Sequence, residues 1–125
     1  MISEDMKIFL LEAYEKLDEV EQGLLAAEQT PGDLALLNKI FRAIHTIKGN
    51  SGFLALTEIE TLCHRGEALL DRLRNGTIQL SSEAASALLA VVDALRNEFA
   101  TIEATGNSSS GFGTSALSQI EKLLR

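Results

Sequence analysis

The residues of this chain best suited to chemistry lie within positions 44–52, where a histidine, a lysine and two glycines occur at helical spacing. Residues three, four and seven positions apart share one face of a helix, so the four align in a stripe. The stripe consists of His45, Lys48, Gly49 and Gly52. A glycine inside a helix costs about 1 kcal/mol relative to alanine. Two glycines beside a histidine therefore indicate that another molecule approaches the imidazole over bare backbone.

A second group of polar residues is expected to face this stripe from the next helix. If the two helices form an antiparallel hairpin, residues equally far from the turn face each other, which pairs His45 with His64. The same register pairs Arg42 with Glu67. Helical side chains lean toward their own N-terminus, so the imidazole of His45 reaches toward the Glu67 carboxylate. A carboxylate that accepts a hydrogen bond from one ring nitrogen fixes the tautomer and leaves the other nitrogen nucleophilic. Lys48 offers a compact cation to an anion attached there.

The elements that must position these residues are helices. Apolar residues recur at steps of three and four along four segments, which predicts an all-α protein with an antiparallel up-down four-helix bundle and a short additional C-terminal helix. We expect the bundle at residues 1–104 and a flexible Gly/Ser-rich linker at 105–113. The final helix, at 114–125, is too short to be stable alone and must dock on the bundle or on another chain.

Capping residues predict where the helices begin. Each predicted start follows a side chain that accepts a hydrogen bond from the first turn. These side chains belong to Ser3, to either Thr30 or Asp33, to Thr57 in a capping box with Glu60, and to Ser81.

Composition excludes several classes of function. The 125 residues carry 11 Lys and Arg against 18 Asp and Glu, a net charge of −7, which disfavours binding to nucleic acid. Cys63 is the only cysteine, so no disulfide forms within the chain. The acidic N-terminus lacks the apolar segment of a secretion signal, and no apolar stretch is long enough to span a bilayer. We therefore expect a cytoplasmic protein without membrane insertion.

A ten-residue segment and its surroundings resemble a known family. The segment is His45-Thr46-Ile47-Lys48-Gly49-Asn50-Ser51-Gly52-Phe53-Leu54, with Ile40-Phe41-Arg42-Ala43 before it and Leu69-Leu70-Asp71-Arg72-Leu73-Arg74 on the next helix. It resembles the histidine-containing phosphotransfer (Hpt) domain, and its spacing to His64 and Glu67 is similar to that in the N-terminal phosphotransfer domain of CheA-type chemotaxis kinases. The resemblance covers about residues 4 to 100. One departure is Ala55, where the family usually has glycine.

The resemblance implies a phosphorelay carrier without autonomous catalysis. His45 would accept the γ-phosphoryl group of ATP from a separate histidine kinase domain and pass it to an aspartate of a response regulator. Lys48, His64 and Glu67 would surround His45, with Lys48 stabilising the phosphate and Glu67 bonding the ring nitrogen that is not phosphorylated. The chain has no Gly-rich nucleotide loop, so ATP and Mg²⁺ are expected to come with the partner domains. The docking partner is expected over three positions of the second helix, namely Arg42, Gly49 and Gly52.

Two other interpretations stay open from the residues alone. His45, His64 and Glu67, with Cys63 as a further donor, could instead form a metal site in the bundle. A purely structural interaction module is the second alternative, with self-association through the C-terminal helix.

Overall fold

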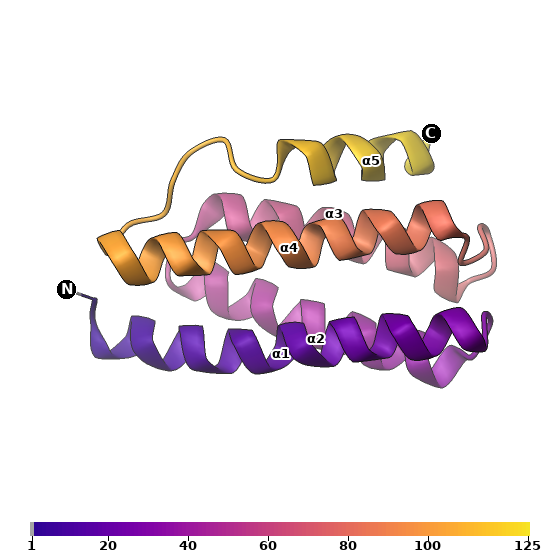
Figure 1. Ribbon diagram of the computed structural model, residues 1–125, viewed down its shortest axis with the longest axis horizontal. Coiled ribbons are helices and arrows are strands. Elements are labelled where there is room, and N and C mark those ends of the chain that lie inside the picture. The colour runs from indigo at the N-terminus through magenta and orange to yellow at the C-terminus, as the bar shows by residue number, and fades with distance from the viewer. Residues whose placement is uncertain (1) are drawn as a thin grey trace.

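The computed structural model describes residues 2–125, which form five helices and no strand (Figure 1). The helices are α1 (Glu4–Gln29), α2 (Leu34–Phe53), α3 (Thr57–Arg74), α4 (Ser82–Thr105) and α5 (Thr114–Leu124). The prediction of an all-α bundle with a short fifth helix is confirmed. No helix within residues 2–125 has the length and apolar character that crossing a bilayer requires.

The first four helices close into a ring around one core. Helix α1 packs on α2 and α4, and α3 packs on the same two helices. The largest fully buried side chains come from all four helices and include Leu17, Leu24, Ile40, Ile44, Ile47, Ile59, Leu69, Leu88 and Phe99. Burying one such side chain contributes about 1.5–3 kcal/mol. This packing fixes the register of α2 against α3, which carry the candidate site.

The observed helix caps agree with the prediction at three of the four starts. Ser3 and Ser81 accept backbone hydrogen bonds as predicted, and Asp33 caps α2 through a bond from the Leu36 amide. Thr30 is not the cap of α2, because it ends α1, where both its amide and its hydroxyl donate to the Ala26 carbonyl.

The predicted capping box at Thr57 and Glu60 is wrong. Helix α3 begins at Thr57, and the cap position is Leu56, which makes no side-chain capping bond. The carbonyl of Leu56 already accepts the first helical bond, from the Glu60 amide at 3.0 Å. Leu56 is 9% exposed, and burying this side chain contributes more than one capping hydrogen bond.

The turn between α2 and α3 contains a strained residue. Ala55 has a φ of 60°, and among residues 2–125 it is the only non-glycine residue with a positive φ. The Leu56 amide donates to the Ser51 carbonyl at 2.8 Å and the Ala55 amide to the Gly52 carbonyl at 3.1 Å. These two bonds form a Schellman motif, whose left-handed position normally holds glycine. The turn thus keeps the geometry that glycine favours although alanine occupies the position.

The segment between α4 and α5 is held against the bundle. The carboxylate of Glu98, 2% exposed, accepts bonds from the Ser109 amide at 2.6 Å, from the Ser109 hydroxyl at 2.5 Å and from the Ser108 hydroxyl. The segment that the sequence marks as a flexible linker therefore makes specific contacts with α4.

Helix α5 then docks on α3 and α4, with Ala116 and Ile120 buried (Figure 1). Arg65 pairs with Glu121 across this contact at 2.7 Å. Of the two docking sites that the sequence allows for this helix, the structure uses the bundle. The buried face of α5 is covered within the chain, so the structure gives no support to self-association through it.

Candidate functional site

His45 lies on the outer surface of the α2–α3 pair. Its neighbours Ile44 and Ile47 are each 1% exposed and anchor α2 in the core, whereas the His45 side chain is 61% exposed. The helical period produces this difference, because residues one position from the apolar stripe point away from the core. The imidazole is therefore accessible to another molecule while its backbone is rigidly held.

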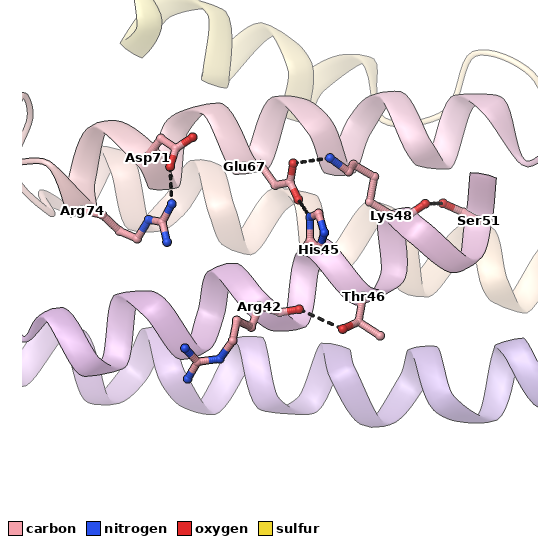
Figure 2. A network of polar contacts seen from close by, with 8 residues as sticks. All are labelled: Arg42, His45, Thr46, Lys48, Ser51, Glu67, Asp71 and Arg74. Carbon is pink, nitrogen blue, oxygen red and sulfur yellow. Dashed lines mark hydrogen bonds and ion pairs between the residues drawn. The ribbon is translucent and has the colours of Figure 1, made fainter. Parts of the chain in front are cut away.

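Glu67 on α3 binds the imidazole across the helix pair (Figure 2). The His45 Nδ1 and the Glu67 Oε2 atoms are 2.7 Å apart, and the Glu67 side chain is 7% exposed. An ionised carboxylate only accepts hydrogen bonds, so Nδ1 carries the proton and donates it to Glu67. In the neutral imidazole, this arrangement leaves Nε2 with an unshared electron pair. The proximity of these two residues agrees with the hairpin register derived from the sequence.

Lys48 completes a triad with the same carboxylate. Its Nζ donates to the Glu67 Oε1 at 2.6 Å, so each oxygen of the buried carboxylate has one cationic or N–H partner. A buried carboxylate needs such partners, because an unpaired charge in the interior is very unfavourable. Lys48 therefore has a structural partner in addition to the phosphate-binding role expected for it. Its carbonyl accepts a bond from the Ser51 hydroxyl at 2.9 Å.

The two glycines of the stripe differ in their surroundings. A Cβ atom added at Gly49 would meet nothing within 4 Å, so the surface beside His45 is open there. A Cβ atom added at Gly52 would lie 2.5 Å from the Glu60 Oε2 atom. The absent side chain at Gly52 therefore makes room for a side chain of α3, and Gly49 is the better marker of an approach surface.

Two other predicted site residues stand apart from the triad. His64 is exposed on α3, and within the described part of the chain no hydrogen bond or ion pair joins it to His45 or Glu67. Arg42 is exposed one turn before His45, and its carbonyl accepts a bond from the Thr46 hydroxyl at 3.0 Å (Figure 2).

Sequence reasoning missed Phe41, which lies beside the imidazole, and Arg74, which lies over the Phe41 ring. The rings of Phe41 and His45 are nearly parallel, at 10°, with centroids 6.1 Å apart. The guanidinium carbon of Arg74 lies 3.7 Å from the centroid of the Phe41 ring. The spacing of four residues between Phe41 and His45 was an available signal, because such pairs are neighbours on a helix.

The donor set of a metal site is not assembled. Across residues 2–125, no group of three or more His, Cys, Asp or Glu side chains is placed to hold a metal ion. Cys63 is buried beside the site, and burial, followed by the nearby Glu67 charge, raises its pKa to about 12. Its thiol keeps its proton at neutral pH, whereas a metal ligand must be a thiolate. The metal-binding interpretation therefore has no support from this arrangement.

Known proteins share this architecture. The family model of the Hpt domain matches residues 6–98. The chain is 36% identical over 124 residues to the sensor histidine kinase CheAY of Helicobacter pylori, which covers 99% of this chain. It spans only 15% of that protein, and a similarly small share of the other CheA proteins it matches.

Solved structures are similar over nearly the whole chain. The solution structure of the histidine phosphotransfer domain of CheA has a TM-score of 0.87 at 31% identity, and covers 98% of this chain and 93% of its own. The phosphorylated P1 domain of CheA3 from R. sphaeroides, solved in complex with CheY6, has a TM-score of 0.88 at 28% identity, with coverages of 97% and 95%.

Proposed function

The chain belongs to the Hpt domain family, in its CheA type, and from this premise we propose that His45 is its phospho-acceptor. In this proposal a histidine kinase domain transfers the γ-phosphoryl group of ATP to His45, and a response regulator then takes it onto an aspartate. The observation that carries the proposal is an exposed imidazole whose Nδ1 is bound to the buried carboxylate of Glu67.

This geometry supports Nε2 as the nitrogen that is phosphorylated, a choice that the sequence left open. The electron pair of Nε2 attacks the γ-phosphorus, the N–P bond forms, and the bond to the bridging oxygen breaks as ADP leaves. Positive charge develops on the ring in this step, and the Glu67 carboxylate at Nδ1 stabilises it. In the second step the regulator's carboxylate attacks phosphorus, the N–P bond breaks, and Nε2 regains its electron pair.

The positive charge of α2 supports binding of two anionic partners, a kinase domain that carries ATP and a response regulator with an acidic site. This helix carries Lys39, Arg42 and Lys48 and has no Asp or Glu, in a chain whose net charge is −7. A helix that carries only cationic charges, in an otherwise negative domain, attracts anions. Lys48 is placed to shift from Glu67 toward the phosphoryl oxygens, since both anions would compete for its ammonium group. His64, exposed on α3, is a further donor for a bound phosphoryl group in this proposal.

The partners in this proposal bring the remaining chemistry. ATP and Mg²⁺ come with the kinase and receiver domains, because the sequence has no Gly-rich nucleotide loop. The similar P1 domain solved in complex with CheY6 supports a response regulator as the second partner. The contribution of the chain is to hold the reacting nitrogen in one orientation, and positioning of this kind accounts for much of the catalysis of phosphoryl transfer.

The test is labelling with a CheA-type kinase core and radioactive ATP. We expect an acid-labile, base-stable label on the chain, as phosphohistidine requires, and its loss in His45→Gln. His64→Gln is the matched control, because it removes the only other histidine and is expected to keep the label. A label that persists in His45→Gln would refute the proposal, and a silent His45→Gln in the full relay would favour the structural-module interpretation.

The docking surface is tested separately. Replacing Gly52 by a bulky residue is expected to slow transfer. The new side chain would also clash with Glu60, so this variant does not separate a docking defect from a distortion of the hairpin. Gly49→Leu is the cleaner variant, since nothing within the chain occupies that space. We expect kcat/KM for transfer to fall about tenfold, while the thermal unfolding temperature does not fall, because leucine is a better helix former than glycine. Ala100→Leu, at an exposed position of α4, is the control and should transfer normally. Normal kinetics in Gly49→Leu would contradict docking over this face.

A further inference from the structure

We propose that Phe41, held by Arg74, is a positioning residue that sets the orientation of the His45 imidazole. This inference deepens the proposed function, on which its kinetic part rests, and its spectroscopic part stands independently. It concerns two residues that neither touch the reacting atoms nor belong to the His45, Lys48 and Glu67 triad.

The imidazole needs a second support because little else holds it. The His45 side chain is 61% exposed, and its one hydrogen bond within the described residues runs from Nδ1 to Glu67. A bond at one ring atom fixes the position of that atom but leaves the ring free to rock about it. Rocking moves Nε2, on the opposite side of the ring, more than it moves Nδ1.

The phenyl ring of Phe41 stacks on the imidazole of His45 and opposes the rocking of that ring. It lies one turn before His45, and helical side chains lean toward the N-terminus, so the imidazole leans over Phe41. The rings are parallel within 10° with centroids 6.1 Å apart, an offset stack typical of aromatic pairs. With the carboxylate at Nδ1 and Phe41 beside the ring, both the position and the tilt of the imidazole are defined.

Phe41 is itself held in place from α3. The guanidinium carbon of Arg74 lies 3.7 Å from the Phe41 centroid, at cation–π distance. Arg74 in turn donates to the Asn38 Oδ1 atom at 3.1 Å and to the Asp71 carboxylate (Figure 2 shows the Asp71 contact). These bonds orient the guanidinium plane so that it covers the phenyl ring. The contact chain Arg74–Phe41–His45 therefore links the C-terminal end of α3 to the reacting ring.

This role predicts a defect in the chemical step and not in docking. If Phe41 orients Nε2, its loss lowers the fraction of molecules with the electron pair aligned for in-line attack, which lowers kcat. KM for the partner should not change, because Arg42 and the open surface at Gly49 remain. If Phe41 served only to fill space, its loss would lower stability and leave the orientation of the ring unchanged.

The experiment compares Phe41→Leu, Phe41→Tyr and Arg74→Met with Phe112→Leu. Phe112 is a half-buried phenylalanine packed against the core near α5, so it controls for loss of a phenyl ring elsewhere. The first readout is NMR of the isolated chain, using ring ¹⁵N shifts for the tautomer and three-bond couplings for the His45 rotamer. We expect one tautomer and one rotamer in the wild type, in Phe41→Tyr and in Phe112→Leu. Averaged three-bond couplings are expected in Phe41→Leu, and partly averaged couplings in Arg74→Met, whereas the tautomer is kept in both because Glu67 still binds Nδ1.

The second readout is phosphorylation by the kinase core. We expect kcat to fall roughly tenfold in Phe41→Leu, with KM unchanged, and to stay near the wild-type value in Phe41→Tyr. The inference is overturned by an unchanged His45 rotamer in Phe41→Leu, by a rise in KM in place of the fall in kcat, or by an equal loss in Phe112→Leu. An unlabelled wild-type chain would instead refute the proposed function and leave the NMR result to decide the positioning role.

Discussion

At the scale of single residues, Glu67 joins two candidate site residues of α2 through its two oxygens, Oε2 to His45 and Oε1 to Lys48. A buried carboxylate with two partners orients both of them, as the residues behind a metal ligand or a catalytic base do. The sequence predicted the contact with His45. It did not decide whether Lys48 binds the same carboxylate, because a flexible lysine has several acids within reach.

Glu67→Gln tests this double role. The amide is neutral, so it neither stabilises charge on the ring nor attracts the Lys48 ammonium group. We expect transfer to His45 to slow by about 10- to 100-fold, the usual effect of removing an orienting partner, with a smaller effect in Lys48→Met. Single-turnover phosphorylation by the kinase core measures both. Equal rates in Glu67→Gln and the wild type would contradict the orienting role.

The raised pKa of Tyr14 predicts that the free energy of unfolding falls at alkaline pH. Its pKa is raised to about 12, first by burial and then by its hydrogen bond to Glu103, at 2.6 Å. The folded state keeps the phenolic proton to a higher pH than the unfolded state, so this contribution is complete below about pH 10 and is lost toward pH 12. Tyr14 is the only tyrosine and there is no tryptophan, so its ionisation is visible by absorbance.

The measurement is urea unfolding at pH 8 and pH 11 in the wild type and in Tyr14→Phe. The free energy of unfolding should fall more steeply with pH in the wild type, because Phe has no proton to lose. Parallel pH dependences would show that Tyr14 does not titrate with the raised pKa.

At the scale of helices and turns, the α2–α3 hairpin decides whether His45 and Glu67 meet. Its turn contains Ala55 at a φ of 60°, in the left-handed position of a Schellman motif. An L-residue in this conformation costs roughly 1–2 kcal/mol. The hydrogen bonds of the turn and the burial of Leu56 hold the backbone there despite the strain.

Ala55→Gly is therefore expected to stabilise the chain. Relief of strain exceeds the extra entropy that glycine gives the unfolded chain, which leaves a gain of about 0.5–1 kcal/mol. Ala100→Gly, at an exposed position inside α4, is the matched control and should cost about 1 kcal/mol. Urea unfolding measures both free energies. A loss of stability in Ala55→Gly would mean that the turn is not strained as its φ indicates.

At the scale of the whole molecule, Glu98 connects the bundle to the segment that returns the chain to α5. It is 2% exposed and accepts bonds only from residues 108 and 109 among its described contacts. Helix α5 lies on α3 and α4, away from α1 and α2. The docking of α5 and the geometry of His45 are therefore expected to be separable.

Glu98→Ala tests this separation. It leaves the Ser109 amide without its acceptor, and we expect a loss of about 1–3 kcal/mol. Hydrogen exchange should rise at the amides of residues 114–124, while phosphorylation of His45 keeps its rate. Ser110→Ala, at an exposed position of the same segment, should change neither. A slowed phosphorylation would show that α5 does influence the site.

The amino-acid sequence by itself determined the helices, their antiparallel order and the face that carries His45, Lys48 and Gly49. It also determined the approach of Glu67 to His45. These features depend on spacing along the chain, since the helical period and a short hairpin convert sequence separation directly into position.

Only the tertiary structure decided how distant side chains share partners. Lys48 binds Glu67, Arg74 covers Phe41, and the backbone after α4 binds Glu98. Packing also placed Leu56, and not a polar cap, at the start of α3. Each of these outcomes is a competition between several partners of similar intrinsic strength. Spacing along the chain does not rank such partners, because the ranking depends on which of them the folded core brings within reach and shields from water.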